Sequence, residues 1–319
     1  MSLATKILKK ATKKLPQRLS SIVAGSILKR NTIVPFYHVI EDCAENALPD
    51  EEHQLHTITL ANFNIHLDLL KKYTNIVSLE TLQNRILNRK SVKGYSAITF
   101  DDGCSSFFTH ALPVLKEKRI PVTLFVTTSL LAGDLFWRDK VREIIKRDLT
   151  QQFVAFAHSY PALSGLTEKH FYQKTKHPSI DQKMLDTVLD VFLAKHDLKI
   201  SQSPYMTIQD LNSCDYDLLT IGNHTHAHYM LSSLSIEDQS DEISTAQKKL
   251  QEWGLDTKGL FSIPFGGKTT YSDETLSLLN QLGYTNISAT GDKLSSFQRV
   301  NDEQTIIYRT MASNSPNII

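Results

Sequence analysis

Apolar residues form two kinds of pattern along the chain, short β-type runs and longer stretches with helical spacing. The first run, residues 31–40 (NTIVPFYHVI), predicts a short buried strand that ends at Tyr37 and His38. Residues 63–73 (FNIHLDLLKKY) have helical spacing, and Asn62 is the expected N-cap of that helix. The next predicted elements are a strand and helix in 76–87, a strand at 96–100, a helix at 110–119 and a strand at 121–128.

The same alternation returns in the second half of the chain. Predicted helices there cover residues 206–213, 235–254 and 273–283, and predicted strands lie in 217–222, 259–266, 286–290 and 305–311. Strands that alternate with helices predict parallel strands joined by helical crossovers. This number of elements fits a (β/α) barrel or an open doubly wound sheet.

Residues 136–205 interrupt this rhythm. Segments 136–147 and 182–196 have helical spacing, and the stretch between them is irregular. The interruption follows a strand that ends near Thr128. We expect residues 33–319 to form one domain. Because loops after strands shape the carboxyl end of a parallel sheet, we expect this insertion to form a helical cap over one end of that domain.

Composition narrows the class of protein. The chain has 319 residues, of which 41% are hydrophobic and 22% charged, as in soluble proteins with a substantial core. A net charge of +1 gives no reason to expect a nucleic-acid partner. The cysteines, Cys43, Cys104 and Cys214, are widely spaced and form neither a metal motif nor a disulfide framework, which fits a reducing compartment.

Residues 1–32 form a basic amphipathic segment that we expect to be distinct from the rest of the chain. No acidic residue precedes Glu41, and the apolar run at 19–28 is too short to span a bilayer. The basic residues around that run do not fit a signal peptide, so we expect a cytoplasmic protein. Residues 1–30 suit contact with the inner face of an anionic membrane, and they equally suit a solvated helix that caps the domain.

Two polar clusters follow predicted strands. Asp101 and Asp102 come directly after the strand at 96–100, and His224 and His228 follow the strand at 217–222. In parallel α/β architectures such strand ends meet at one edge. A helical turn would place these two histidines on one face and His226 on another. Two imidazoles and a carboxylate make a metal site with open positions, and a cation would relieve the repulsion between the aspartates while leaving one free as a base.

Each cluster alone has an ordinary interpretation. Asp-Asp-Gly is usually a turn, and His-x-x-x-His is usually an exposed pair on a helix. The two motifs rarely both fall at strand ends of one domain by chance. Two histidines and one carboxylate are also the ligands of non-haem iron oxygenases, but that chemistry has no use for a second adjacent aspartate.

Three stretches carry a family resemblance: TFDDG at 99–103, GNHTxxH at 222–228 and Pro-Phe-Gly at 264–266. In this order they resemble the NodB-like polysaccharide deacetylases, carbohydrate esterase family 4, over residues 33–310. The resemblance implies a distorted (β/α) barrel that removes acetyl groups from glycans with a divalent metal ion, often zinc. It implies Asp101 as catalytic base and, as metal ligands, Asp102, His224 and His228.

The third motif departs from the family pattern Arg-x-Pro-(Tyr/Phe)-Gly, because Ser262 stands where the family has Arg. The backbone N–H of Phe265 is the expected oxyanion donor, and Pro264 and Gly266 are candidate substrate contacts. Arg309, on the last predicted strand, is a candidate to replace the missing guanidinium. It is equally interpreted as an ordinary surface or core-edge arginine.

The family's late Leu-x-x-His, which supplies a general acid, is absent, since no histidine follows His228. His38 is the candidate acid because its strand ends in the same mouth. The alternative is that His38 packs beneath the metal site or hydrogen-bonds one of the metal ligands. Trp137 and Arg138, at the start of the insertion, are candidates for binding a sugar, with helix-start packing as the alternative.

These expectations combine into one hypothesis with one main alternative. The chain is expected to be a metal-dependent hydrolase that removes an acetyl group, N-acetyl rather than O-acetyl, from a sugar or glycan precursor. The alternative is a degenerate relative that binds glycan without turnover. The sequence predicts neither the sugar nor the oligomeric state.

Overall fold

The computed structural model describes residues 25–42, 57–200, 204–291 and 294–316. Most of the basic segment expected at 1–32 lies outside the described residues, and the described part, 25–30, is helical. Within these ranges, no helix combines the length and the apolar character needed to cross a membrane.

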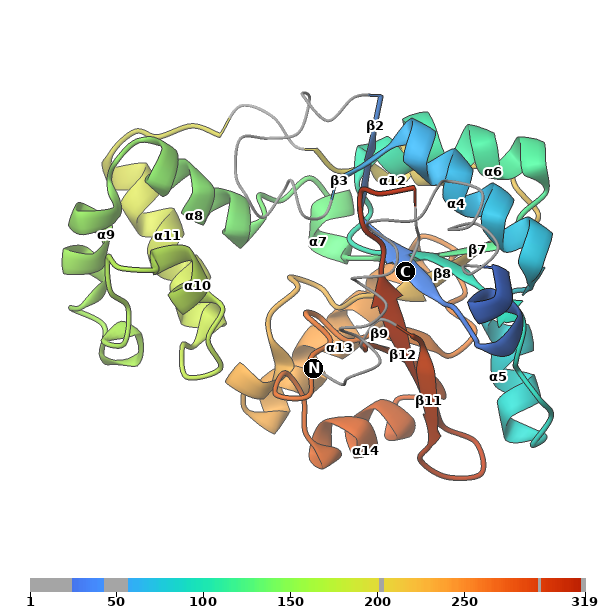
Figure 1. Cartoon of the computed structure of the whole chain (residues 1–319). Coiled ribbons are helices and arrows are strands. Elements are labelled where there is room, and N and C mark those ends of the chain that lie inside the picture. Colours follow the sequence, from blue (N-terminus) through green and yellow to red (C-terminus); the bar gives the residue numbers. More distant parts are fainter. Residues whose placement is uncertain (1–24, 43–56, 201–203, 292–293, 317–319) are drawn as a thin grey trace.

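A closed barrel of parallel strands is the centre of the molecule (Figure 1). The neighbouring strands are, in order, β1 (Pro35–Tyr37), β6 (Ile98–Phe100), β7 (Val122–Val126), β8 (Leu219–Asn223), β9 (Leu260–Ser262), β10 (Asn286–Thr290) and β12 (Thr305–Met311). Pairing of β1 with β12 closes the ring, so the predicted barrel is confirmed and the open doubly wound sheet is wrong. A further strand, β11 (Ser296–Arg299), pairs antiparallel with β12.

The barrel strands are short and almost entirely buried. Every residue of β7 is buried, as expected for parallel strands that are covered on both faces. Two small parallel pairs flank the barrel: β2 (Val39–Glu41) with β3 (Thr57–Thr59), and β4 (Asn75–Ile76) with β5 (Tyr95–Ser96).

Helices surround the barrel (Figure 1). They are α4 (Leu60–Tyr73), α5 (Leu79–Leu87), the π-helix η2 (Phe107–Ala111) with α6 (Leu112–Lys118), α7 (Thr128–Leu131), α12 (Ile208–Asn212), the 3-10 helix η4 (Leu231–Ser233), α13 (Ile236–Glu252) and α14 (Asp273–Gln281).

The prediction that Asn62 is the N-cap of α4 is wrong. Thr59 caps α4, and its hydroxyl accepts the backbone N–H of Asn62 at 3.2 Å, so Asn62 already lies in the first turn.

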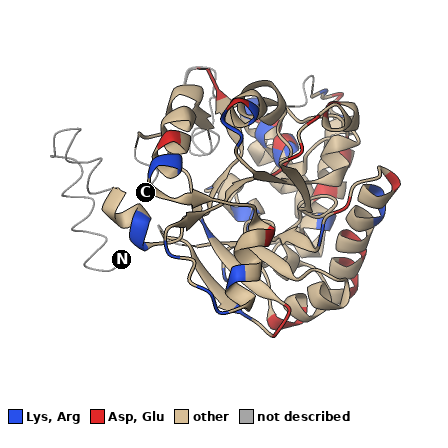
Figure 2. Ribbon diagram, turned by 90° about the vertical axis from the view of Figure 1, so that its right-hand side faces the viewer, with Lys and Arg blue, Asp and Glu red and all other residues tan. Residues whose placement is uncertain are grey.

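Residues of the predicted insertion form a helical lobe beside the barrel (Figure 1). Its elements are α8 (Trp137–Lys146), α9 (Thr150–Ala157), η3 (Pro161–Leu163), α10 (Phe171–Thr175) and α11 (Gln182–Lys195). Buried side chains such as Phe153, Leu185 and Phe192 form an apolar cluster in this lobe, and that cluster continues to Cys104 and Leu130 beside the barrel. In Figure 2, basic and acidic positions are interspersed around the ribbon, which matches the near-neutral net charge.

Candidate active site and metal centre

The predicted polar residues meet at the carboxyl ends of the barrel strands. Asp101 and Asp102 follow β6, His224 and His228 follow β8, and Arg309 lies on β12. All of them are buried. Such a concentration of buried charge is costly unless each group has a partner, so the contacts of each side chain indicate its role.

Asp101 forms a bidentate ion pair with Arg309. The guanidinium donates from Nη1 to Oδ1 at 2.8 Å and from Nη2 to Oδ2 at 2.7 Å. Burial raises the pKa of Asp101, but the charge and hydrogen bonds of Arg309, together with the nearby histidines, outweigh it and leave that pKa below its usual range. The carboxylate is therefore anionic and fixed in orientation.

Ser262 and Thr99 complete the environment of this guanidinium. Nη2 of Arg309 donates to Ser262 Oγ at 2.8 Å, and Nη1 donates to Thr99 Oγ1 at 3.1 Å. Ser262 stands at the motif position where the family has an arginine. It thus binds Arg309, an arginine that comes from a different strand. The roles of Ser262 and Thr99 were missed in the sequence, and the only available signal was the paired presence of Ser262 and a late Arg309.

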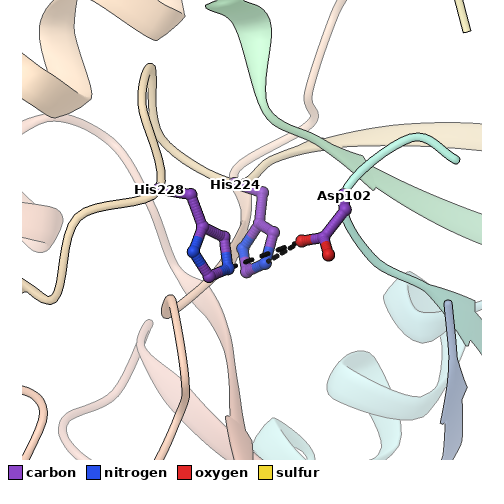
Figure 3. A group of neighbouring side chains, drawn as sticks. All are labelled: Asp102, His224 and His228. Atoms are coloured by element: carbon purple, nitrogen blue, oxygen red, sulfur yellow. Dashed lines mark ion pairs between the residues drawn. The ribbon is translucent and has the colours of Figure 1, made fainter. Parts of the chain in front are cut away.

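Asp102 faces two imidazoles, as Figure 3 shows. Oδ1 of Asp102 lies 3.4 Å from Nε2 of His224 and 3.4 Å from Nε2 of His228. One potential ligand atom from each of the three residues lies within 4.8 Å of the others. This separation suits a shared cation.

The hydrogen bonds of the group also suit a cation. Nδ1–H of His224 donates to the Ser262 carbonyl at 2.8 Å, which leaves the lone pair of a neutral ring at Nε2, facing the Asp102 carboxylate. Among the described residues, Asp102 Oδ1 has no hydrogen-bond partner despite being buried. Acceptor atoms turned toward one another in a buried site are expected around a metal ion.

The protonation states agree with this interpretation. Burial raises the pKa of Asp102, but the nearby histidines outweigh it and hold that pKa well below its usual range. Burial lowers the pKa of His228 to about 3, so its ring is neutral. Burial also lowers the pKa of His224, but the charges of Asp101 and Asp102 raise it overall. A bound cation would take the place of the proton that these carboxylates favour.

The histidine pair does not lie on a helical turn, so that part of the sequence prediction is wrong. Residues after β8 form an irregular loop in which Thr225 has a φ of 68° and His228 a φ of 59°. These left-handed residues turn the chain so that His228 returns toward His224. His226 points elsewhere, since its Nδ1 lies 2.9 Å from Thr128 Oγ1, and it does not join the ligand group.

His38 lies beside the three candidate metal ligands, near Oδ2 of Asp102. Its Nε2 is 3.9 Å from Oδ2, and its side chain is 17% exposed. Burial lowers its pKa, more than the charge of Asp102 raises it. The ring is therefore a partly open, neutral imidazole at the edge of the site.

The loop after β9 borders the same site. Phe265 has a φ of 61°, and its ring centroid is 5.1 Å from that of His228. Pro264 is buried, and Gly266 leaves no room for a side chain, since a Cβ there would lie 2.6 Å from the Thr290 nitrogen.

Trp137 and Arg138, at the start of the insertion, differ in their position relative to the site. Trp137 is 1% exposed and packs against Phe136 and Phe265, which is helix-start packing rather than an open surface for a sugar. The Arg138 guanidinium lies over the rings of Phe136 and Phe265, at 5.2 and 5.7 Å from their centroids. It therefore reaches the edge of the loop that borders the site.

A family model and several solved structures match this chain. A family model described as polysaccharide deacetylase matches residues 88–189 and 205–287, more than half of the chain. The Streptococcus pyogenes deacetylase PplD, solved in complex with acetate, is 16% identical with a TM-score of 0.57, over 91% of this chain and 98% of that chain.

IcaB from Ammonifex degensii is 17% identical with a TM-score of 0.56, over 89% of this chain and 92% of that one. A de-N-acetylase from Aggregatibacter actinomycetemcomitans is 15% identical with a TM-score of 0.57, covering 89% and 96%. Comparison with curated protein sequences gave no match. At these identities the structural matches show the shared fold, and the family model shows more: this chain belongs to the polysaccharide deacetylase family.

Proposed function

We propose that this protein is a metal-dependent hydrolase that removes an N-acetyl group from a sugar or a glycan precursor. One observation carries the proposal: two adjacent carboxylates have opposite environments, Asp101 bound by Arg309 and Asp102 facing two imidazoles. A deacetylase needs this division, with one carboxylate to accept a proton and the other to hold a cation.

Asp102, His224 and His228 are the residues that would hold the ion, for which we propose zinc because of its preference for nitrogen and oxygen ligands. A bound divalent ion supplies Lewis acidity toward the acetyl carbonyl and lowers the pKa of water. The proteins of this family typically use such an ion, and the buried Asp-His-His group fits it.

Asp101 is the proposed general base. Its carboxylate accepts a proton from the attacking water, and Arg309 fixes its direction and keeps it anionic beforehand. Arg309 thereby takes over, from β12, the role that the family's missing arginine would have. The N–H of Phe265, on the loop after β9, is the proposed donor to the oxyanion.

His38 is the proposed general acid. An amine leaving group needs a proton, and His38 is the partly exposed imidazole beside Asp102. Because its pKa is lowered, His38 is neutral at rest, so the proton that it gives to the leaving amine is the one that Asp101 first accepts from the attacking water. We further propose that the helical lobe borders substrate entry, with Arg138 contacting the sugar, and that the substrate is a soluble or lipid-linked precursor in the cytoplasm.

Acetate release from a panel of N- and O-acetylated sugars tests the proposal. The zinc-loaded protein should release acetate, and Asp101→Asn should lower the rate by roughly 10²–10⁴-fold with metal content unchanged. Asp302→Asn is the control, because that carboxylate is 99% exposed. If the zinc-loaded protein binds acetylated glycans but releases no acetate from any of them, the glycan-binding alternative replaces the enzyme.

A further inference from the structure

The two histidines of the candidate metal centre are held in different ways. His224 follows β8 directly, and its ring is fixed by the bond from Nδ1 to the Ser262 carbonyl. His228 lies farther along, and among the described residues its Nδ1 has no hydrogen-bond partner. The direction of the His228 ring therefore depends on its backbone and on packing against Phe136 and Phe265.

That backbone belongs to residues 225–230, here called the histidine loop. Side chains from other segments accept several of its N–H groups. Asn223 Oδ1 accepts from Thr225 at 2.7 Å, and Gln182 Oε1, from α11 of the helical lobe, accepts from Met230 at 2.6 Å. Within the loop, Thr225 Oγ1 accepts from the backbone N–H of His228 at 3.0 Å.

Glu242 of α13 is the acceptor at the centre of the loop. Its Oε1 accepts from the backbone N–H of Ala227 at 2.5 Å, next to His228 in the sequence. Burial raises the pKa of this carboxylate, whereas the backbone N–H groups of Ala227, Tyr229 and His226 and the hydroxyl of Thr225 act to lower it. Glu242 is 8% exposed, so this carboxylate is buried against the loop.

A carboxylate suits this position better than any neutral side chain. It offers acceptor sites on two oxygens and no donor, so it can serve several converging N–H groups at once. An amide of the same shape would bring its own N–H₂ against these donors. The loop also contains two left-handed residues, Thr225 and His228, a conformation that persists only where surrounding contacts hold it.

We propose that Glu242 is a positioning residue for the metal centre. By accepting the backbone N–H of Ala227, next to His228, it holds the histidine loop in the form that turns His228 toward Asp102. The inference rests on the proposed metal site and adds to it a residue that touches neither metal nor substrate. Outer contacts of this kind typically change metal affinity by about 10–100-fold.

Zinc and cobalt titrations of the full chain test this role. Glu242→Gln and Glu242→Ala should weaken Zn²⁺ binding, measured by competition with a chromophoric chelator, by about 10–100-fold. They should also alter the visible absorption spectrum of bound Co²⁺, which reports ligand geometry and which a purely structural role would leave unchanged. Asp241→Asn is the matched control, since Asp241 is the preceding, exposed carboxylate of α13.

A double-variant cycle identifies the route of the effect. If Glu242 acts through His228, Glu242→Gln should weaken Co²⁺ binding on the wild-type background but add almost nothing on the His228→Ala background. Equal weakening on both backgrounds, or wild-type affinity and spectrum in Glu242→Gln, overturns the proposal. Should Glu242→Ala fail to fold by circular dichroism, the near-isosteric Glu242→Gln decides.

The outcomes separate this inference from the proposed function. Normal metal binding in the wild type without acetate release overturns the deacetylase activity and leaves the role of Glu242 intact. A wild-type protein that binds neither Zn²⁺ nor Co²⁺ overturns the metal centre and, with it, the positioning role.

Discussion

The candidate site has two halves that are built differently, although they begin from adjacent residues. The arginine half consists of Asp101, Arg309, Ser262 and Thr99. The histidine half consists of Asp102, His224 and His228. In the first, side chains borne by or adjoining the barrel strands bind one another, whereas in the second, acceptor atoms face one another.

Backbone origin explains the difference. Thr99, Ser262 and Arg309 lie within β6, β9 and β12, so the register of the barrel sets their positions. Asp102 and His228 lie on loops with φ values of 70° and 59°. The charges of Asp101 and Arg309 are therefore paired within the protein, although Arg309 Nε has no hydrogen-bond partner among the described residues. The charges of the histidine half are instead arranged around a position that suits a cation.

The largest expected effect comes from removing a ligand in the histidine half. His224→Ala and His228→Ala should each weaken Zn²⁺ binding by more than the roughly 10–100-fold that loss of an outer contact costs. Competition titration measures this, and His226→Ala is the control because His226 instead contacts Thr128. Equal loss in all three variants would contradict the assignment of ligands.

The next effect tests His38, which borders the histidine half. His38→Ala should lower turnover of N-acetyl substrates by roughly 10²–10⁴-fold, since an amine leaves only with a proton. An acetyl ester with a good leaving group needs no such proton, so its turnover should change much less. The comparison uses acetate release with metal content held constant. Unchanged amide turnover would leave the acid unassigned.

The arginine half should dominate stability. Arg309→Ala leaves Asp101 buried without its partner and should lower the free energy of unfolding by about 3–5 kcal/mol in urea denaturation. Arg299→Ala removes an arginine from an ion pair whose partner, Asp302, is 99% exposed, and should cost about 0–1 kcal/mol. Similar losses in both variants would mean that the buried pair contributes no more than a surface one.

Sequence reasoning found the charged residues and the histidines of both halves, but not the roles of Ser262 and Thr99, for a topological reason. Short apolar runs located the strands, and parallel strand ends must share one mouth, so Asp101, Asp102, His224 and His228 were expected to meet. From the sequence, pairing with Asp101 was only one of two interpretations of Arg309. The two residues are 208 positions apart, and a local sequence pattern does not give the register between distant strands.

What the sequence could not give was loop geometry. The spacing of His224 and His228 suggested a helical turn, but left-handed Thr225 and His228 bring the rings together on an irregular loop. Such conformations are rare for non-glycine residues, so a sequence pattern gives no warning of them. Glu242 gave no signal either, because a glutamate within a helix is ordinary unless its burial is known.

The smallest effect concerns pH and distinguishes the two halves. Burial raises the pKa of Asp101, and the charge of Arg309 is the largest of the effects that together lower it to below the usual value. Replacing Arg309 by Gln removes the lowering charge, so the pKa of Asp101 should rise. A general base must be deprotonated, so the acidic limb of the pH profile of kcat/KM should move to higher pH in Arg309→Gln. Arg309→Lys keeps the charge and should move the limb less.

Zn²⁺ affinity at neutral pH should stay close to that of the wild type in both variants, because the ligands belong to the other half. An unmoved limb in Arg309→Gln would show that the base titrates independently of the arginine half.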